Sequence, residues 1–315
     1  MTVTPVHFVP PPKILVLLAS YNGIAWIEEQ LASLLAQQAV QVDLLIGDDA
    51  SGDGTAALLT ALVTAHCNVR VCGWDTSSGS AGANFRRMYV AADLAGYDFV
   101  ALADQDDLWL PNKLARAVEA LRTSGADGYS CAVNAFWPNG RAKVLTQTGK
   151  VRAADFLFEG AGQGCTFVVR TALFAKVQQF CRAQPAQAAT LHYHDWLIYL
   201  LARVWGYRWH FDTTPMIHYR QHGGNEIGSR SGLSAIGKRL DMIKNGWYLA
   251  QVRAAGVLYC TAGGADRRVL EVVAAVEPGR SAWKRLLLLG RVVRDGRRRL
   301  SDRAVLALAV IVGWL

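Results

Sequence analysis

Short apolar runs alternate with segments of helical periodicity through residues 14–122, and this alternation constrains the fold more than any other feature. The apolar runs predict buried strands at 14–19, 42–47, 69–73 and 99–103. The helical patterns lie at 24–38, 55–65, 81–92 and, behind Pro111, 112–122. Continuous apolar strands separated by helices are typical of a mostly parallel sheet that helices cover on both faces. The sequence therefore predicts an α/β fold.

Beyond residue 128 the alternation is less regular. Strand patterns occur at 129–134, 165–170, 208–211 and 216–219, and helical patterns at 173–180 and 194–204. Residues 223–232 are rich in Gly, Asn and Ser, which predicts a mobile loop. From residue 233 onward the pattern is helical.

The net charge of +8 is concentrated in the last fifth of the chain. Residues 1–250 hold 21 basic and 20 acidic side chains, whereas residues 251–315 hold 12 and 5. The apolar share of 52% excludes a disordered chain. The six cysteines form no CxxC pair, which favours buried free thiols over a disulfide scaffold. Residues 1–12 lack a signal-peptide pattern, and the late apolar run 304–315 is shorter than the roughly 20 residues that span a bilayer.

Polar clusters follow three of the predicted strands, at 20–23, 48–55 and 104–107. The carboxyl ends of parallel strands meet at one sheet edge, where ligands of open α/β sheets bind. The cluster Asp104-Gln105-Asp106-Asp107 places three carboxylates in four residues, and their mutual repulsion calls for a counter-ion. Mg²⁺ takes carboxylate oxygens together with substrate phosphates. The alternative is a solvated acidic turn ahead of the next helix.

Segment 48–55 predicts a tight turn. Asp49-x-Ser51-x-Asp53-Gly54 is like the start of a calcium loop, but the twelfth position is Thr60 instead of Glu. No GK[ST] follows, so the segment is not a phosphate-binding P-loop. We expect Asp53 or Thr55 to cap the following helix, which leaves Asp49 free to accept a hydrogen bond from a ligand.

Three motifs together resemble the family-two glycosyltransferases of GT-A fold: ASYNG at 19–23, GDDASGDGT at 47–55 and ADQDDLWLPNK at 103–113. Four further motifs are similar to the bacterial rhamnosyltransferase branch, which builds O-antigen and related surface polysaccharides. They are NF at 84–85, GCT at 164–166, HDW at 194–196 and YRQH at 219–222. The resemblance covers roughly residues 12–225. YRQH replaces the QxxRW of processive synthases, which argues against a polymerase.

The resemblance implies a Rossmann-like GT-A domain followed by a basic helical C-terminal region. The expected limits are a disordered segment 1–12, a catalytic domain 13–230 and the helical region 231–315. Within the domain, residues 13–127 would bind the nucleotide sugar and residues 128–230 the acceptor. The implied donor-binding residues are Ala19 and Tyr21 against the base and ribose, Asp49 on the pyrimidine N3–H, Asn84, Asp104, Asp106 and Arg220.

The resemblance also implies a metal, a base and an acceptor wall. Mg²⁺ or Mn²⁺ would be held by Asp106, Asp107 and His222. Asp195 falls where such enzymes place the catalytic base, although it also suits a plain helix cap. The implied acceptor-binding residues are Gly164, Cys165, His194 and Trp196.

One carboxylate base without a protein nucleophile predicts a single displacement with inversion. The expected reaction transfers a sugar, L-rhamnose from dTDP-rhamnose, to a hydroxyl of a lipid-linked glycan. A sugar-1-phosphate nucleotidyltransferase is the second hypothesis, but SYNG lacks the basic residues that its phosphate loop needs. The third is a non-catalytic basic α/β binding module. The acidic edge argues against it, because carboxylates repel phosphates unless a metal intervenes.

Residues 281–299 mix Trp283 and several leucines with basic side chains. This composition predicts contact with an anionic membrane surface, and so a cytoplasmic enzyme at the inner face of the cell membrane. A helical subdomain docked on the core with a solvated basic face is the alternative. Nucleic acid is not expected as a partner, because stacking aromatics are sparse and no nucleic-acid motif is present. The terminal run 304–315 suits a core helix, a homodimer contact or a shallow membrane anchor.

Overall fold

The computed structural model describes residues 10–147, 149–222, 241–279 and 281–315. Most of the expected disordered segment 1–12 and the whole of the expected loop 223–232 lie outside the described residues. So does the expected boundary at 230/231.

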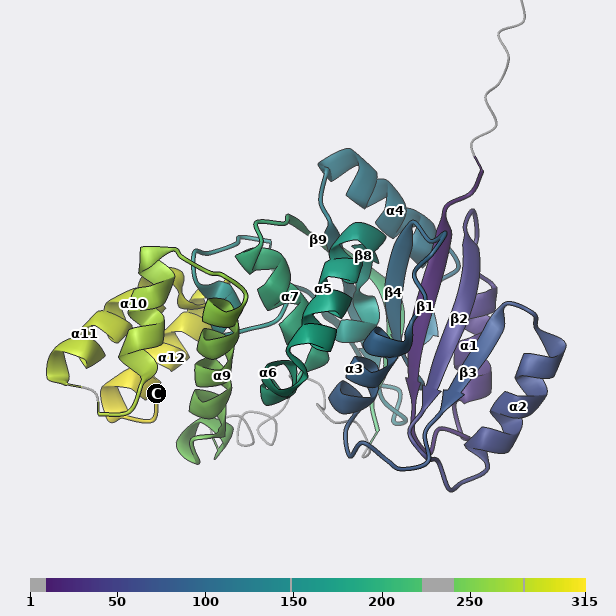
Figure 1. Cartoon of the computed structure of the whole chain (residues 1–315), viewed down its shortest axis with the longest axis horizontal. Coiled ribbons are helices and arrows are strands. Elements are labelled where there is room, and N and C mark those ends of the chain that lie inside the picture. Colours follow the sequence, from purple (N-terminus) through teal and green to yellow (C-terminus); the bar gives the residue numbers. More distant parts are fainter. Residues whose placement is uncertain (1–9, 148, 223–240, 280) are drawn as a thin grey trace, which may run out of the picture.

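The N-terminal half is a parallel sheet (Figure 1). Its strands β1 (Lys13–Ser20), β2 (Gln41–Asp48), β3 (Val69–Gly73) and β4 (Phe99–Asp104) lie in the order β3-β2-β1-β4. Ser20 pairs with Asp48, and Ala19 pairs with Asp104. This register brings the loops after β1, β2 and β4 to one edge, as the strand pattern predicts.

Helices cover both faces of this sheet. Along β1, Ile14, Val16 and Leu18 point into one apolar core, and Leu15 and Leu17 into the other. The first core includes α1 (Ile27–Leu35), α2 (Thr55–Ala65) and α4 (Lys113–Ser124). The second includes α3 (Ala81–Ala91), α5 (Thr171–Ala183) and α7 (His194–Val204), with the short α6 (Pro185–Thr190) beside them. The periodicity did not indicate α6.

The second half extends the sheet with mixed strand directions. It adds β5 (Leu108–Trp109), β6 (Gly128–Phe136), β7 (Ala142–Leu145), β8 (Val168–Arg170) and β9 (Trp209–Arg220), in the order β4-β8-β6-β9-β5 with β7 on β6. The four longest ladders are parallel and the short ones antiparallel.

Three predicted strands differ from the structure. The strands expected at 208–211 and 216–219 form one strand, β9, whose pairing with β6 shifts register between Cys131 and Asn134. Pro215 lies in this stretch, where it has no N–H to give to a regular ladder. The strand expected at 165–170 begins only at Val168, because Gly164–Thr166 forms a 3-10 turn, η2.

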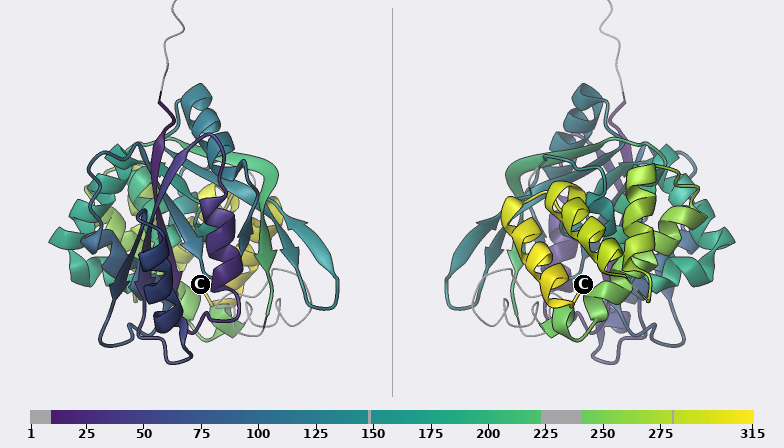
Figure 2. Two further views of the ribbon diagram at one scale, coloured as in Figure 1. Left: turned by 90° about the vertical axis from the view of Figure 1, so that its right-hand side faces the viewer. Right: turned by 90° about the vertical axis from the view of Figure 1, so that its left-hand side faces the viewer.

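The C-terminal helices pack at one end of the molecule, far from α2 (Figures 1 and 2). They are α9 (Trp247–Thr261), α10 (Arg267–Val276), α11 (Ala282–Arg291), the irregular turn η3 (Val292–Gly296) and α12 (Leu300–Val312). Their buried residues belong to the same apolar core as α7. Among the described residues, no helix has the length and apolar character needed to span a membrane.

The basic run at 297–299 faces inward instead of forming the solvated face considered from sequence. The Arg298 side chain is 1% exposed and lies 3.5 Å from Asp155 and 3.6 Å from Glu159. Arg297 pairs with Glu159 at 3.2 Å. Asp155 begins the 3-10 turn η1 (Asp155–Leu157), so these ion pairs attach the C-terminal helices to the second half of the domain.

Candidate active site

The loops after β1 and β2 hold one another by hydrogen bonds between side chains and backbone. The Asn22 N–H donates to Ser51 Oγ (2.8 Å), and the Gly52 N–H donates to Asn22 Oδ1 (2.9 Å). The Asp53 carboxylate accepts from the N–H of Thr55, the first residue of α2, at 3.0 Å. Asn22 has a φ of 48°, a left-handed conformation that asparagine tolerates better than most residues. The edge of the site is therefore pre-formed.

Gln105 positions Tyr21, a role that the sequence did not suggest. Its Oε1 accepts from the Tyr21 N–H (2.8 Å), and its Nε2 donates to the Tyr21 carbonyl (2.9 Å). The Tyr21 side chain remains 52% exposed and so is available to a ligand. The sequence signal for this role was an amide between two carboxylates in the 104–107 cluster. An amide can both donate to and accept from one peptide unit.

Two predicted donor-binding residues already have partners within the fold. Asp49 was expected to be free for a ligand, but its carboxylate accepts hydrogen bonds from Ser77 Oγ (2.9 Å) and from the Ser78 N–H (2.8 Å). Arg87 Nη1 lies 3.3 Å from the same carboxylate. The buried Asn84 donates to the Gly47 carbonyl (2.8 Å) and accepts from Trp74 Nε1 (3.0 Å). An N–H group of the nucleotide's pyrimidine would have to compete with these partners for Asp49. The hydrogen bonds of Asn84 have a structural role. Ala19 is buried inside β1.

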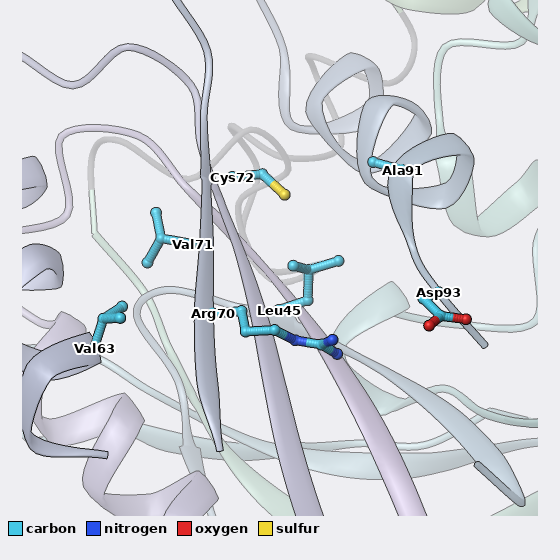
Figure 3. Close-up of a pocket in the computed structure, with 7 residues that line it drawn as sticks. All are labelled: Leu45, Val63, Arg70, Val71, Cys72, Ala91 and Asp93. Atoms are coloured by element: carbon cyan, nitrogen blue, oxygen red, sulfur yellow. The ribbon is translucent and has the colours of Figure 1, made fainter. Parts of the chain in front are cut away.

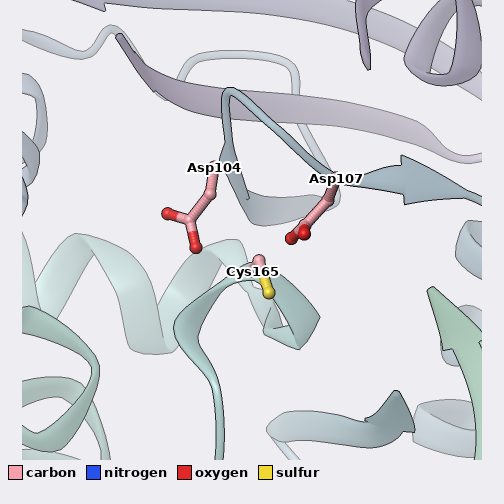
Figure 4. Close-up of side chains that lie close together, drawn as sticks. All are labelled: Asp104, Asp107 and Cys165. Carbon is pink, nitrogen blue, oxygen red and sulfur yellow. The ribbon is translucent and has the colours of Figure 1, made fainter. Parts of the chain in front are cut away.

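Asp104, Asp107 and Cys165 point toward one another at the sheet edge (Figure 4). One ligand atom of each lies within 4.8 Å of the others. Asp107 is fully buried, and its Oδ1 accepts from the Arg220 N–H (3.2 Å). Its Oδ2 is buried without a hydrogen-bond partner in the part of the chain that the structure describes. Burial, and then the charges of Asp106 and Asp104, raise the pKa of Asp107 well above its ordinary value. A cation at this point would offset both the burial of the Asp107 carboxylate and its repulsion by Asp106 and Asp104.

Asp106 and His222 form the neighbouring pair. His222 Nε2 lies 2.7 Å from Asp106 Oδ2, and the His222 ring stacks on Trp26 with 4.2 Å between ring centroids. Two ligand atoms at right angles, each about 2.1 Å from one ion, stand about 3 Å apart. The spacing of the pair therefore suits two ligands of one divalent ion. Among the described residues, the group of three whose ligand atoms lie within 4.8 Å is Asp104, Asp107 and Cys165, and it does not include Asp106 or His222. Burial raises the pKa of the Cys165 thiol, so this sulfur stays protonated and is a poor ligand for a hard cation.

Arg220 and Lys113 are basic residues beside the acidic cluster. The Arg220 guanidinium donates to the Asp106 carbonyl (3.0 Å) and pairs with Glu29 (2.6 Å). Lys113 is fully buried, with Nζ 3.1 Å from the centroid of the Trp109 ring and 3.4 Å from the Cys165 carbonyl oxygen. Burial lowers its pKa to about 7. Sequence reasoning missed Lys113, because a lysine in the first turn of an amphipathic helix is usually solvated.

Gly164 separates the acidic cluster from Asp195. A Cβ at Gly164 would lie 2.8 Å from His194 Cε1 and 3.2 Å from Asp195 Cβ, and the next residue, Cys165, faces Asp104. Asp195 is the second residue of α7 and is partly exposed. The structure therefore brings together Asp195, the segment of Gly164 and Cys165, and the acidic cluster.

Three of the predicted acceptor-binding residues have buried side chains. Cys165 is fully buried, His194 is 8% exposed and Trp196 is 4% exposed. Trp196 Nε1 donates to the Phe156 carbonyl (2.7 Å). His194 packs against Phe85 of α3 and Trp196 bonds to η1, so these two side chains give an acceptor little surface to contact. The buried Gly164 has no side chain to offer.

An open hollow of about 450 Å³ lies elsewhere, between β3 and the ends of α2 and α3 (Figure 3). It is lined by Leu45, Val63, Arg70, Val71, Cys72, Ala91 and Asp93. None of the site residues predicted from sequence lines it, so it is separate from the acidic edge.

The fold and the acidic edge define a class of α/β protein with a possible divalent-cation site where its parallel strands end. The model of glycosyl transferase family 2 matches residues 15–172, about half of the chain. The chain belongs to this family, and the family expected from the motifs is confirmed.

Named relatives and solved structures agree with this membership. The dTDP-rhamnosyl transferase RfbG of Shigella flexneri is 34% identical over 75% of this chain and 82% of its own length. TarS 1–349 of S. aureus, in complex with UDP-GlcNAc, matches 89% of this chain and 79% of its own, with a TM-score of 0.58 and 16% identity. The mannosyltransferase PcManGT of Pyrobaculum calidifontis, in complex with GDP-Man and Mn²⁺, matches 99% and 84%, with a TM-score of 0.53 and 18% identity. The two structural likenesses confirm the GT-A fold.

Proposed function

We propose that this chain is an inverting, divalent-metal-dependent rhamnosyltransferase that moves L-rhamnose from dTDP-rhamnose to a hydroxyl of a lipid-linked glycan. The observation that carries the proposal is the group of Asp104, Asp107 and Cys165, with Asp106 of the same segment, which pairs with His222, and with Asp195 across Gly164. The donor is inferred from the relative named as a dTDP-rhamnosyl transferase, which matches over most of both chains. The exposed Tyr21 and the neighbouring Asp49 would receive the nucleoside.

Asp195 is the proposed catalytic base. Its carboxylate takes the proton of the acceptor hydroxyl, whose oxygen then bonds to the anomeric carbon on the face opposite the diphosphate. The bond from that carbon to the diphosphate oxygen breaks, and its electron pair leaves with dTDP. A single displacement by the acceptor itself inverts the anomeric configuration. A positioned base of this kind contributes about 10²- to 10⁴-fold to such a reaction.

The acidic cluster is proposed to hold Mg²⁺ or Mn²⁺ through Asp106, Asp107 and His222, with Asp104 beside the donor. When bound, the ion neutralises the charge that develops on the leaving diphosphate. His222 would be held in place by the Trp26 ring, and Asp107 by the Arg220 backbone. The fixed surroundings hold these ligands in position before the donor arrives.

Substitution of Asp195 and Asp106 separates chemistry from binding. Asp195→Asn should lower turnover of dTDP-rhamnose about a thousandfold and leave Mn²⁺-dependent dTDP binding unchanged, because only the base is lost. Asp106→Asn should weaken that binding about tenfold or more. Initial rates and calorimetric titration of dTDP with Mn²⁺ measure the two effects.

Asp93→Asn, at the hollow away from the site, is the matched control and should change neither quantity. Full turnover by the Asp195 variant would remove it as the base. Unchanged metal-dependent binding by the Asp106 variant would remove the metal assignment.

We also infer that the enzyme works in the cytoplasm at the inner membrane face, with α12 lying on the anionic bilayer surface. Leu300, Leu308 and Ile311 are 72%, 59% and 60% exposed and, with Ala304, lie at helical spacing on one face of α12. Trp283 and Leu286 on α11 are also exposed. Lys284 and Arg294 are exposed and lie near the two ends of α12. Arg285, next to Lys284, donates to the Ile311 carbonyl, and Arg303 donates to the Arg294 carbonyl. Apolar and basic side chains together suit anionic headgroups.

The double variant Leu308→Glu/Ile311→Glu tests this surface. It should lower the affinity for phosphatidylglycerol vesicles about tenfold or more, because two apolar contacts are replaced by charges that the headgroups repel. Vesicle co-sedimentation measures the affinity, and Val144→Glu, an exposed valine on β7, is the control. Unchanged vesicle binding would overturn the proposal. A loss of dimers on size exclusion with unchanged vesicle binding would assign the α12 face to a second copy.

A further inference from the structure

Helix α3 contacts both sides of the candidate site. Toward the nucleotide side, Asn84 Nδ2 donates to the Gly47 carbonyl (2.8 Å) and lies 3.4 Å from the Ser20 carbonyl. Arg87 reaches Asp49 at 3.3 Å. These contacts fix the helix to the ends of β1 and β2, where the nucleoside is proposed to bind.

The same helix touches the turn that leads into Asp195. A Cβ at Gly82 would lie 2.4 Å from the His192 carbonyl oxygen, so only glycine permits this close approach. One turn further, the Arg86 guanidinium donates to the carbonyls of Leu191 (3.2 Å) and His192 (3.3 Å). Backbone groups of the turn before α7 are therefore held by α3.

The third contact between α3 and this turn is a buried hydrogen bond. Tyr89 Oη lies 2.6 Å from His194 Nδ1, and the His194 ring stacks on Phe85 with 3.9 Å between centroids. Tyr89 and Phe85 are fully buried. Burial, assisted by the nearby Arg86, lowers the pKa of His194 to about 3, so the ring stays neutral at any working pH. Burial raises the pKa of Tyr89 well above its ordinary value, so the phenol keeps its proton.

We propose that Tyr89 and His194 are positioning residues, through which α3 sets the place of Asp195 relative to the nucleotide site. The inference rests on the proposed function, because it takes Asp195 as the base. His194 immediately precedes Asp195, so a shift of the imidazole moves the start of α7 and the carboxylate with it. A misplacement of about 1 Å at a reacting group can cost about a hundredfold in rate. Neither residue needs to touch substrate in this role.

A purely structural role would lower stability, whereas a positioning role lowers kcat at constant donor affinity. Tyr89→Phe keeps the ring and removes only the hydroxyl. It should lower kcat about tenfold and leave KM for dTDP-rhamnose and the Kd for dTDP unchanged. Tyr129→Phe is the matched control, because Tyr129 is also fully buried and donates one hydrogen bond to a distant partner, Asp212 (2.9 Å). It should leave kcat within twofold of the parent value.

A second pair of variants asks whether the Nδ1 bond is the important contact. His194→Asn keeps a polar atom near the place of Nδ1, whereas His194→Leu has similar bulk and no polar atom. The Asn variant should retain kcat within about threefold, and the Leu variant should lose at least tenfold. Thermal unfolding of both variants identifies any general loss of folding.

The outcomes separate this inference from the proposed function. Unchanged kcat in Tyr89→Phe, or equal kcat in the two His194 variants, with an inactive Asp195→Asn, would overturn the positioning role and leave the base assignment intact. Full turnover by Asp195→Asn would remove the base assignment and this inference with it.

Discussion

At the scale of residues, Lys113, Asp107 and Arg298 show three ways in which a buried charge is accommodated. The pKa of Lys113 falls to about 7, so the ammonium can lose its charge. The pKa of Asp107 rises, and its unpaired oxygen is the feature that a cation would satisfy. Arg298 instead lies between Asp155 and Glu159 and donates to the Gly160 carbonyl (2.7 Å).

Replacement of Arg298 tests whether this buried pairing holds the C-terminal helices to the domain. Arg298→Met should lower the free energy of unfolding by about 3 kcal/mol, because removing one partner of a buried ion pair leaves the acids under-compensated. Urea unfolding followed by circular dichroism measures the change. Arg294→Met, an exposed arginine of the same segment, should stay within about 0.5 kcal/mol of the parent. A loss below about 1 kcal/mol for the Arg298 variant would mean that apolar packing alone attaches these helices.

At the scale of elements, the sequence pattern predicted those helices and strands that are determined by residues close together in the chain. The bounds of α2, β3 and α7 agree with the apolar periodicity, because each begins or ends at a clear change of pattern. The single strand β9 and the turn η2 were not predictable, because pairing with β6 and the close approach of His194 to Gly164 decide them.

The features of the candidate site also divide into those that the sequence predicts and those that it does not. Its aspartates follow strands and could be found from motif and strand order. The burial of His194 and Trp196, the partners of Asp49 and the inward direction of Arg298 could not. They depend on segments far away in sequence, as the separation of 143 residues between Arg298 and Asp155 illustrates.

At the scale of the whole molecule, the acidic edge and the exposed apolar face lie on different parts of the chain. The carboxylates gather where the parallel strands end, and the α12 face lies in the helical region at the end of the molecule away from α2 (Figure 1). Part of the excess positive charge of residues 251–315 is paired with acids of the preceding domain, as Arg297 is with Glu159 and Arg298 with Asp155. The net charge is therefore partly a property of the fold, and the exposed Lys284 and Arg294 remain for the proposed membrane contact.

The most direct test of the account is the release of nucleoside diphosphate from a panel of sugar nucleotides by the full chain. The panel is dTDP-rhamnose, UDP-glucose, UDP-GlcNAc and GDP-mannose, each with and without bacterial membrane extract as the source of acceptor. The account predicts release of dTDP from dTDP-rhamnose with Mg²⁺ or Mn²⁺, stimulation by the extract, and loss of release in EDTA. Release from none of the donors, or release from dTDP-rhamnose at the same rate in EDTA, would contradict it.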